Sequence, residues 1–547
     1  MRTFVTILLG IALFAVSAEA ADRYLVATRR APREVSVRML RDSDELRSHA
    51  VRTFESVNAF AANLTSAEVA ELKRSAGVRF VSPVVERHAS GQPRAAFLHP
   101  DGSIYTTTQT MPYGVMMIHA PELWPLTKGG AVNVAILDTG IDIRHPDLAA
   151  NYAGGYNTFT PSSEPYDDNG HGTHVAGVIA AVDNNIGVVG VAPEVRIWGV
   201  KVLDRTGFGV DENVIAGVDW VIRKKREIGG DWIMSLSLGA SYDSQVEHEA
   251  IDRVLAEGIL VTAAAGNRAM EEVQYPAAYD GVIAVGAIDS ADKLALFSDH
   301  GPHLGVVAPG VRVLSTARSG SIPAAAVTLA TGTSVAAATV EGSSRGEVKG
   351  EYVACGVGNP EDFPFEVRGK IAVIRRGEIT FNLKVRNAEI AGAVSVVIFN
   401  KDESDYSGWT LLRPDCQSIE GCDDPTHRWP VVLAVSAADG QRLLDDHTRV
   451  MDMGAWYDDY MTLSGTSQAT PHAAGALALI WSLAPTATAD RVKDALLSTT
   501  IDLGVPGFDL TYGHGLIDAL AAAKNLAPWR FAPPAMPVEP HRLPDIP

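Results

Sequence analysis

The chain has 547 residues, 46% of them hydrophobic and 20% charged, a balance that excludes a mainly disordered, collagen-like or coiled-coil protein. Its 46 basic and 65 acidic side chains give a net charge of −19, and no stripe of Lys and Arg could follow a phosphate backbone, so we expect no nucleic-acid partner. Three cysteines are too few for a disulfide scaffold.

The first twenty residues have the order of a secretory signal. Arg2 supplies the positive charge, segment 4–16 is apolar, and residues 18–20 have the small-residue pattern of a cleavage site. The apolar run is too short for a membrane span, which needs about 20 residues. We therefore expect residues 1–20 to be a signal peptide, and the mature protein to be secreted without a stable membrane anchor.

The segment 21–105 mixes short elements and then becomes a linker. Segment 23–28 favours a strand, and 66–75 favours a helix with Ser66 as its N-cap. From residue 88 to 110, Gly, Pro, Ser, Thr and Ala predominate, which is typical of a linker.

A regular alternation of strands and helices begins near residue 131. Short apolar runs stand at 132–137, 195–203, 233–237, 259–264 and 281–285. Helical patterns such as 171–182 and 212–227 lie between them. Strands that alternate with helices predict a parallel sheet with helices on both faces.

A second domain interrupts this alternation. The pattern stops near Ala317 and returns at Tyr460, where a long apolar helix runs to Leu483. Between them, residues 340–450 have strands and a helix of their own, so we expect an inserted domain. The proline-rich tail 527–547 should be extended or disordered.

All three cysteines lie in the insert. In an exported protein two of them could pair, as Cys355 with Cys416 or as Cys416 with Cys422, leaving one free. The sequence leaves both pairings open.

Three motifs bring together an acid, an imidazole and a hydroxyl. Asp138 ends the buried strand in VAILDTG, His171 opens a helix in HGTHVAG, and Ser467 opens another in GTSQATPHAAG. These are the groups of nucleophilic acyl transfer, in which an imidazole takes the serine proton and the acid orients the imidazole. A helix N-terminus also offers backbone N–H groups to a developing oxyanion.

These motifs, in the order Asp, His, Ser, resemble the subtilisin-like serine proteases. The matches continue at 237–239 (SLG) and 263–267 (AAAGN). The resemblance implies a three-layer α/β fold with a mainly parallel sheet, made by residues 106–317 and 455–526. It implies a monomeric serine endopeptidase that acts on proteins or peptides.

The resemblance also implies roles for individual residues. Asp138 would orient, His171 would be the general base and acid, Ser467 would attack, and Asn267 would donate to the oxyanion. Substrate would pair with two extended segments, through Ser237, Leu238, Gly239, Gly207 and Gly209. Gln468 stands where the family commonly has Met, and we expect it to make the protein tolerant of peroxide.

Other interpretations of single motifs are weaker. Ser334 in GTSVA is a decoy for the nucleophile, because no Pro-His and no long helix follow it. His174 follows His171 at half-site spacing for a metal, but no third ligand follows and packing is the better interpretation. Asp138-Thr-Gly lacks the second carboxylate of an aspartic protease. A non-catalytic binding protein and an esterase are the rival functions.

A structural Ca²⁺ site is the remaining site that the resemblance implies. An all-oxygen shell suits calcium rather than zinc. The ligands would be side-chain oxygens of Gln109, Asp147 and Asn184 and backbone carbonyls of Val182, Ile186 and Val188.

The two remaining regions also have family counterparts. Residues 21–105 resemble an α+β propeptide with its linker, which would template folding and act as an intramolecular inhibitor until self-cleavage between Tyr105 and Gln109. The insert at 340–450 resembles a β-rich protease-associated domain on the segment GKIAVIRRG at 369–377.

Overall fold

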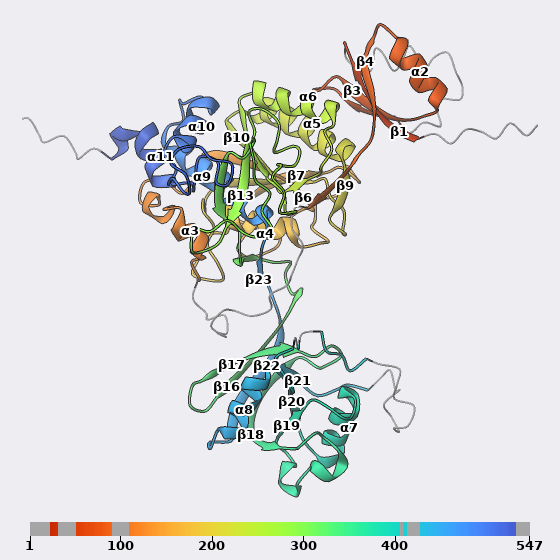
Figure 1. The fold of residues 1–547 in the computed structure, drawn as a ribbon, viewed down its shortest axis with the longest axis vertical. Coiled ribbons are helices and arrows are strands. Elements are labelled where there is room, and N and C mark those ends of the chain that lie inside the picture. The colour runs from red at the N-terminus through yellow and green to blue at the C-terminus, as the bar shows by residue number, and fades with distance from the viewer. Residues whose placement is uncertain are drawn as a thin grey trace, which may run out of the picture.

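The computed structural model describes residues 22–30, 51–89, 109–404, 406, 408–412 and 427–531. Most of these residues form an α/β body, and a smaller barrel lies below it in Figure 1, connected near strand β23 (Tyr460–Leu463). The expected signal peptide and the self-cleavage segment 105–108 lie outside the described residues, as does most of the tail. No helix in the described part of the chain has the length and apolar character needed to cross a bilayer.

A seven-stranded sheet forms the centre of the α/β body. Its order is β14-β13-β12-β10-β6-β8-β7, and every neighbouring pair is parallel. The strands are β6 (Val132–Asp138), β7 (Tyr152–Asn157), β8 (Arg196–Lys201), β10 (Asp231–Leu236), β12 (Ile259–Ala264), β13 (Ile283–Ile288) and β14 (Val306–Pro309). The central ones are buried along nearly their whole length, as a sheet covered on both faces requires.

Two pairs of helices cover this sheet. Helix α4 (His171–Ala180) packs against α9 (Thr466–Leu483), and α5 (Asp211–Ile228) packs against α6 (Gln245–Ala256). Both pairs contact the sheet, and α9 is buried almost throughout, which explains its continuous apolar sequence. The predicted three-layer α/β fold is confirmed.

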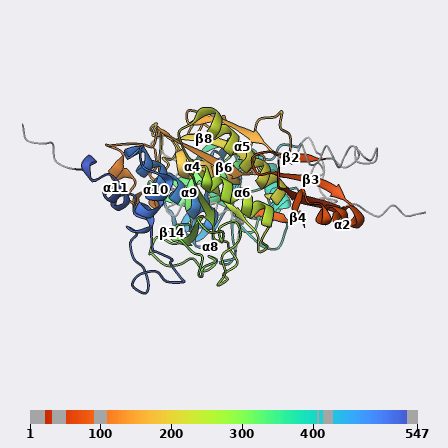
Figure 2. The ribbon, with the colours of Figure 1, turned by 90° about the horizontal axis from the view of Figure 1, so that it is seen from above.

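The N-terminal region forms a separate antiparallel sheet beside helices α5 and α6 (Figure 2). Its order is β2-β3-β1-β4, with β1 (Asp22–Thr28), β2 (Arg52–Phe54), β3 (Ala59–Leu64) and β4 (Val78–Pro83). Helix α2 (Ser66–Arg74) is capped by Thr65, not by the predicted Ser66. Thr65 and Glu68 form a reciprocal capping box, so the cap lies one residue earlier than expected.

The insert is a closed barrel of order β16-β17-β21-β20-β19-β18-β22. Its strands are β16 (Ile322–Leu329), β17 (Ser334–Thr339), β18 (Gly346–Ala354), β19 (Ile371–Arg375), β20 (Ser395–Phe399), β21 (Val432–Val435) and β22 (Val450–Asp458). The predicted limits 340–450 were too narrow, because β16 and β22 close the barrel by pairing with each other from outside those limits. Helices α7 (Phe381–Ala391) and α8 (Ala437–Asp445) accompany it.

Cys355 is a buried free thiol in this domain, so its pairing with Cys416 is not formed. Burial raises the pKa of the Cys355 thiol to about 12, with smaller contributions from nearby acids. Cys416 and Cys422 lie outside the described residues.

The barrel enters and leaves the body through two adjacent strands. Strand β15 (Val313–Thr316) pairs antiparallel with β23, and Ile322 faces Asp458 where the barrel begins. Such partners are about 5 Å apart.

Replacing residues 322–457 with a short Gly-Ser linker should therefore leave a body that folds with one cooperative transition, measured by circular dichroism on heating. A product without that transition would mean that the body needs the barrel to fold.

Candidate active site

Asp138 and His171 meet at the carboxyl end of the sheet. Asp138 is the last residue of β6 and His171 is the first residue of α4, and both are buried. His171 Nδ1 lies 2.7 Å from Asp138 Oδ1. Because an ionised carboxylate only accepts, Nδ1 donates, and Nε2 is the acceptor end of the ring. In the described part of the chain Nε2 has no hydrogen-bond partner.

The environment of the His171 ring favours its charged form. Burial by itself would lower its pKa, but the charge and hydrogen bond of Asp138, with a smaller effect of Asp167, reverse this, so the His171 pKa lies above its ordinary value. The site can therefore stabilise an imidazolium once the ring takes a proton.

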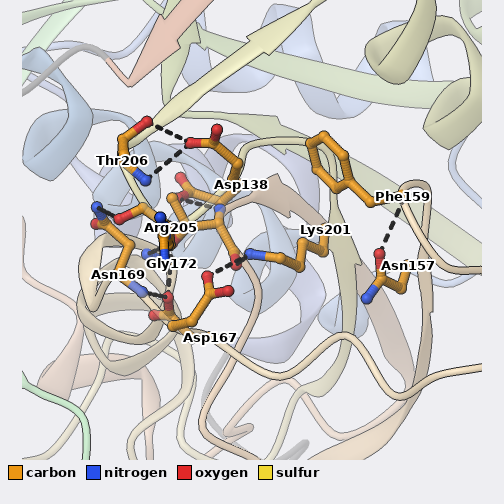
Figure 3. A network of polar contacts seen from close by, with 12 residues as sticks. Asp138, Asn157, Phe159, Asp167, Asn169, Gly172, Lys201, Arg205 and Thr206 are labelled. Atoms are coloured by element: carbon orange, nitrogen blue, oxygen red, sulfur yellow. Dashed lines mark hydrogen bonds and ion pairs between the residues drawn. The ribbon is translucent and has the colours of Figure 1, made fainter.

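Asp167 holds the acid and the imidazole segments together, and the sequence analysis missed it. This buried carboxylate accepts from Thr139 Oγ1 at 2.9 Å, from the Gly170 N–H at 2.8 Å, and from the Thr173 N–H and O–H at 2.9 and 2.6 Å. Figure 3 shows Asp167 close to Asn169, Gly172 and Lys201. Lys201 Nζ donates to Thr139 O at 2.6 Å. The sequence could have indicated this role, because Asp167 is an acid that lies just before the helix starting with His171.

Ser467 lies in the first turn of α9, fully buried against the end of β10. Its Oγ donates to Ser237 O at 2.9 Å, and Ser237 Oγ donates to Ser467 O at 2.9 Å. The two contacts fix the start of α9 against the segment that follows β10. The decoy Ser334 is elsewhere, exposed at the start of barrel strand β17.

Asn267 follows β12 and contacts the residue before Ser467. Its Oδ1 accepts from the Thr466 N–H at 2.9 Å and from Thr466 Oγ1 at 3.0 Å. A backbone N–H can only donate, so the amide oxygen is the atom that faces Thr466. The orientation of the Asn267 NH₂ group is therefore fixed away from Thr466.

The expected substrate segments hold a strand of the chain's own N-terminal region. Strand β5 (Glu86–Ala89) lies between β11 (Leu238–Gly239) and β9 (Phe208–Val210) in an antiparallel three-stranded sheet. His88 and Ala89, expected to begin the linker, are strand residues here. Their composition gave no strand signal, and two flanking strands supply the pairing that overrides it.

The register of β5 includes the expected substrate residues on both sides. Ala89 faces Leu238 and His88 faces Gly239 on one side, while Arg87 faces Gly209 on the other. The Ala89 N–H donates to Gly207 O at 2.9 Å.

The residues expected to bind calcium also gather in one place. Gln109 Nε2 donates to Val182 O at 2.7 Å, to Val188 O at 3.0 Å and weakly to Asn184 Oδ1 at 3.4 Å. Asp147, fully buried, accepts from Asn184 Nδ2 at 2.9 Å and from the Val188 N–H at 3.0 Å. Ile186 is at the exposed turn, where its N–H donates to Asn184 Oδ1.

This arrangement fits a hard cation. Three oxygen atoms from one loop converge on one point, where the amide group of Gln109 now lies, and a buried carboxylate stands beside them. Exchanging the amide ends would turn an oxygen of Gln109 to the same point. The described residues contain no cluster of three or more His, Cys, Asp and Glu side chains suited to another kind of metal.

His174 packs in the interior, which agrees with the packing role preferred over a metal half-site. Its Nε2 donates to Val313 O at 3.0 Å, so this nitrogen is already used. Burial, with the neighbouring His171 charge, lowers the His174 pKa to about 3, which keeps the ring neutral.

Gln468 is fully buried next to Ser467, and neither end of its amide has a hydrogen-bond partner among the described residues. A buried amide without partners costs about 1–3 kcal/mol. The Met that is common at this position has a similar shape and no such cost.

Gln468→Met should therefore raise the free energy of unfolding by about 1 kcal/mol, measured by urea denaturation. Peroxide should cancel this gain in the variant and leave the natural protein unchanged, because methionine sulfoxide is polar. An unchanged or lower stability before oxidation would mean that the amide has partners in solution, such as buried water.

Two families of known proteins match parts of this chain. Residues 129–344 and 412–515 match the subtilase family, and residues 348–443 match the PA domain. A thermostable alkaline protease of Halalkalibacterium halodurans is 37% identical over 303 residues, 55% of this chain and 76% of the relative. Subtilisin E of Bacillus subtilis is 38% identical over 299 residues, 54% of this chain and 71% of the relative.

Two further relatives differ in setting. An intracellular serine protease of Paenibacillus polymyxa is 42% identical over 243 residues, 43% of this chain and 71% of the relative. The crystal structure of a psychrophilic subtilisin-like protease from an Antarctic Pseudoalteromonas has a TM-score of 0.52 and 28% identity, covering 78% of this chain and all of that one. The chain therefore belongs to the subtilase family of serine peptidases and carries a PA domain as an insert.

Proposed function

We propose that this serine peptidase is a secreted endopeptidase that cleaves protein chains through an acyl-enzyme and is made as a self-processing precursor. The observation that carries the proposal is the buried contact of 2.7 Å between Asp138 and His171, with Ser467 in the first turn of α9 and Asn267 just after β12. A non-catalytic binding protein would have no need for this set.

The chemistry follows from the roles of these atoms. Ser467 Oγ leaves its hydrogen bond to Ser237 O and attacks the carbonyl carbon of the substrate, and His171 Nε2, which has no other partner among the described residues, takes the hydroxyl proton. Asp138 keeps the ring in the tautomer that leaves Nε2 as acceptor and stabilises the imidazolium. The imidazolium then gives its proton to the leaving amine. Water then attacks the ester of the acyl-enzyme, with His171 again taking the proton and passing it to Ser467 Oγ. The acid product leaves and Ser467 is restored.

Asn267 would stabilise the oxyanion of each tetrahedral intermediate. Its amide oxygen is held by Thr466, which supports an NH₂ group that faces the reacting carbonyl together with the Ser467 backbone N–H. Loss of the corresponding amide in a subtilisin lowers kcat about 100- to 1000-fold.

Ser467→Ala should abolish proteolysis and labelling by a serine-reactive phosphonate while the protein stays folded, because only the nucleophile is lost. Casein hydrolysis and circular dichroism measure the two effects. Ser334→Ala is the matched control, since it changes the same Gly-Thr-Ser motif in the barrel, and it should keep full activity. Casein turnover by the Ser467 variant, or its loss in the Ser334 variant, would reject the assignment.

The pH profile should report the raised pKa of His171. Catalysis needs the neutral ring, so kcat/KM should fall as the pH drops through the His171 pKa, at a pH above the ordinary imidazole value of about 6.5. Asp138→Asn removes the charge that raises this pKa. It should move the acid limb to lower pH and reduce kcat about 10,000-fold, as the loss of this acid does in other triads. A limb that stays in place would assign the titration to another group.

Self-processing is supported by the strand in the cleft. While β5 pairs with β9 and β11, no substrate can use those segments, so the N-terminal region acts as an intramolecular inhibitor. We keep 21–105 as the propeptide. The register favours a first cut after Ser90, one residue past Ala89, ahead of the cut expected between Tyr105 and Gln109.

N-terminal sequencing of the secreted enzyme distinguishes these sites. A start at Gly91 supports the register, and a start at Thr106 or Gln109 supports the cut expected from the sequence. An active enzyme that starts at Ala21 would refute self-processing. Secretion itself rests on the signal-like residues 1–20, and retention of the protein inside the cell would refute it.

A structural Ca²⁺ is the third part of the proposal. Gln109, Asp147 and Asn184 would hold it with the carbonyls of Val182, Ile186 and Val188. A bound cation would tie the segment at Gln109 to the loop 182–188 and would take no part in the reaction.

Excess EGTA should lower the melting temperature of the processed enzyme, because a ligand that binds only the native state adds about 2.7 kcal/mol at 100-fold saturation. Asp147→Asn should melt at the same temperature with and without EGTA. Equal melting of the natural enzyme in calcium and in EGTA would reject the site.

A further inference from the structure

One side chain of β5 is buried completely in the catalytic body. The guanidinium of Arg87 contacts Glu247 of helix α6, and both side chains are 0% exposed. Arg87 Nε lies 3.2 Å from each carboxylate oxygen, Nη2 lies 2.5 Å from Oε2, and Nη1 donates to Glu86 O at 3.1 Å. The guanidinium therefore meets a carboxylate of the body side-on, with several donors at once.

The surroundings of Glu247 are acidic and polar. Asp211, at the start of α5, accepts from the Val85 N–H at 3.1 Å and from Ser244 Oγ at 2.7 Å. The Tyr279 hydroxyl lies 3.4 Å from Glu247 Oε2. Burial, with the nearby Glu247 charge, raises the Asp211 pKa to about 6, and the Arg87 charge acts in the opposite direction.

Two other ion pairs of the N-terminal region differ in their exposure. Arg23 with Glu212 and Arg79 with Glu249 join the propeptide sheet to α5 and α6, and their arginines are about a quarter exposed at 25% and 27%. Both pairs lie on the docking face and outside the cleft strand β5. Only Arg87, among these three, belongs to the strand that occupies the substrate segments.

The register defines which substrate residue this site would receive. Ala89 faces Leu238 and His88 faces Gly239, so a substrate residue opposite Ser237 comes one position after the equivalent of Ala89. Because Ser237 contacts Ser467 directly, the substrate residue opposite Ser237 is the one whose carbonyl Ser467 would attack. Counting back from it, Arg87 has the fourth position upstream of the cut bond.

We infer that Glu247, supported by Asp211, forms a subsite selective for arginine at the fourth residue upstream of the cleaved bond. This inference rests on the proposed endopeptidase function and adds a substrate class to it, namely chains with a guanidinium at that position. When the propeptide leaves, Glu247 loses its only described ion-pair partner. A substrate arginine restores the pair, whereas a neutral side chain leaves a carboxylate with a desolvation cost. The planar fork of donors favours arginine over lysine.

The test measures kcat/KM of the processed enzyme on quenched peptides that differ only at the fourth upstream residue, with arginine, citrulline, lysine or leucine there. Citrulline keeps the shape of arginine and removes its charge. We expect arginine to exceed citrulline by about tenfold or more, the ratio that about 1.4 kcal/mol of differential binding produces. Equal rates for arginine and citrulline would overturn the inference.

Two enzyme variants locate the effect. Glu247→Gln should reduce the arginine-to-citrulline ratio to near one. The matched control Glu249→Gln, two residues further along α6 and on the docking face, should leave the ratio unchanged. A ratio that survives in the Glu247 variant would overturn the assignment to this residue. If that variant does not fold, the ratio in the natural enzyme still decides.

The outcome also separates this inference from the proposed function. An enzyme that labels with phosphonate and cuts all four peptides equally would keep the endopeptidase function and lose the subsite. A protein that cuts none of them and does not label would lose both.

Discussion

A buried carboxylate facing a buried imidazole sets the demands on the rest of this molecule. Asp138 and His171 are 2.7 Å apart and shielded from water, so each needs partners that a loop alone would not hold in place. The parallel sheet provides Asp138 at the end of a central strand, and α4 provides His171 at its first residue. Asp167 then satisfies the backbone donors between them with one carboxylate.

The same strand ends supply the other proposed groups. Ser237 follows β10 and Asn267 follows β12, and both contact the first turn of α9. Carboxyl ends of neighbouring parallel strands lie along one edge of a sheet, which is where open α/β sheets bind ligands. The segments that carry residues 138, 171, 267 and 467 therefore lie along the same edge of the sheet, although up to 329 positions separate these residues in the sequence.

The sequence predicted what is encoded locally. Buried strands, the helix that starts at His171 and the long helix at Ser467 follow from short apolar runs and turn residues. The contact of Arg87 with Glu247 joins residues 160 positions apart, and no local pattern marks it. Strand β5 is similar, because its pairing comes from β9 and β11 and not from its own composition. The predicted limits of the barrel were too narrow because its first and last strands, β16 and β22, pair with each other across the whole insert, and no local pattern marks that pairing.

The interface between the proposed propeptide and the catalytic body combines two requirements that oppose each other. Inhibition needs a strand that binds well, but maturation needs it to leave. Arginines at 23, 79 and 87 contact acids on α5 and α6, and the pairs of Arg23 and Arg79 are partly open to water. The buried pair is different, because its separation leaves Glu247 uncompensated.

That asymmetry links inhibition to specificity. Under the proposed function, a site that binds the propeptide through a buried guanidinium would also discriminate among substrates by the same group, since both would bind in the register of β5. Arg87 of the proposed precursor would then be the side chain that the inferred subsite prefers in a substrate. The backbone contacts of that strand hold any extended chain, and Arg87 adds the selectivity that backbone pairing alone lacks.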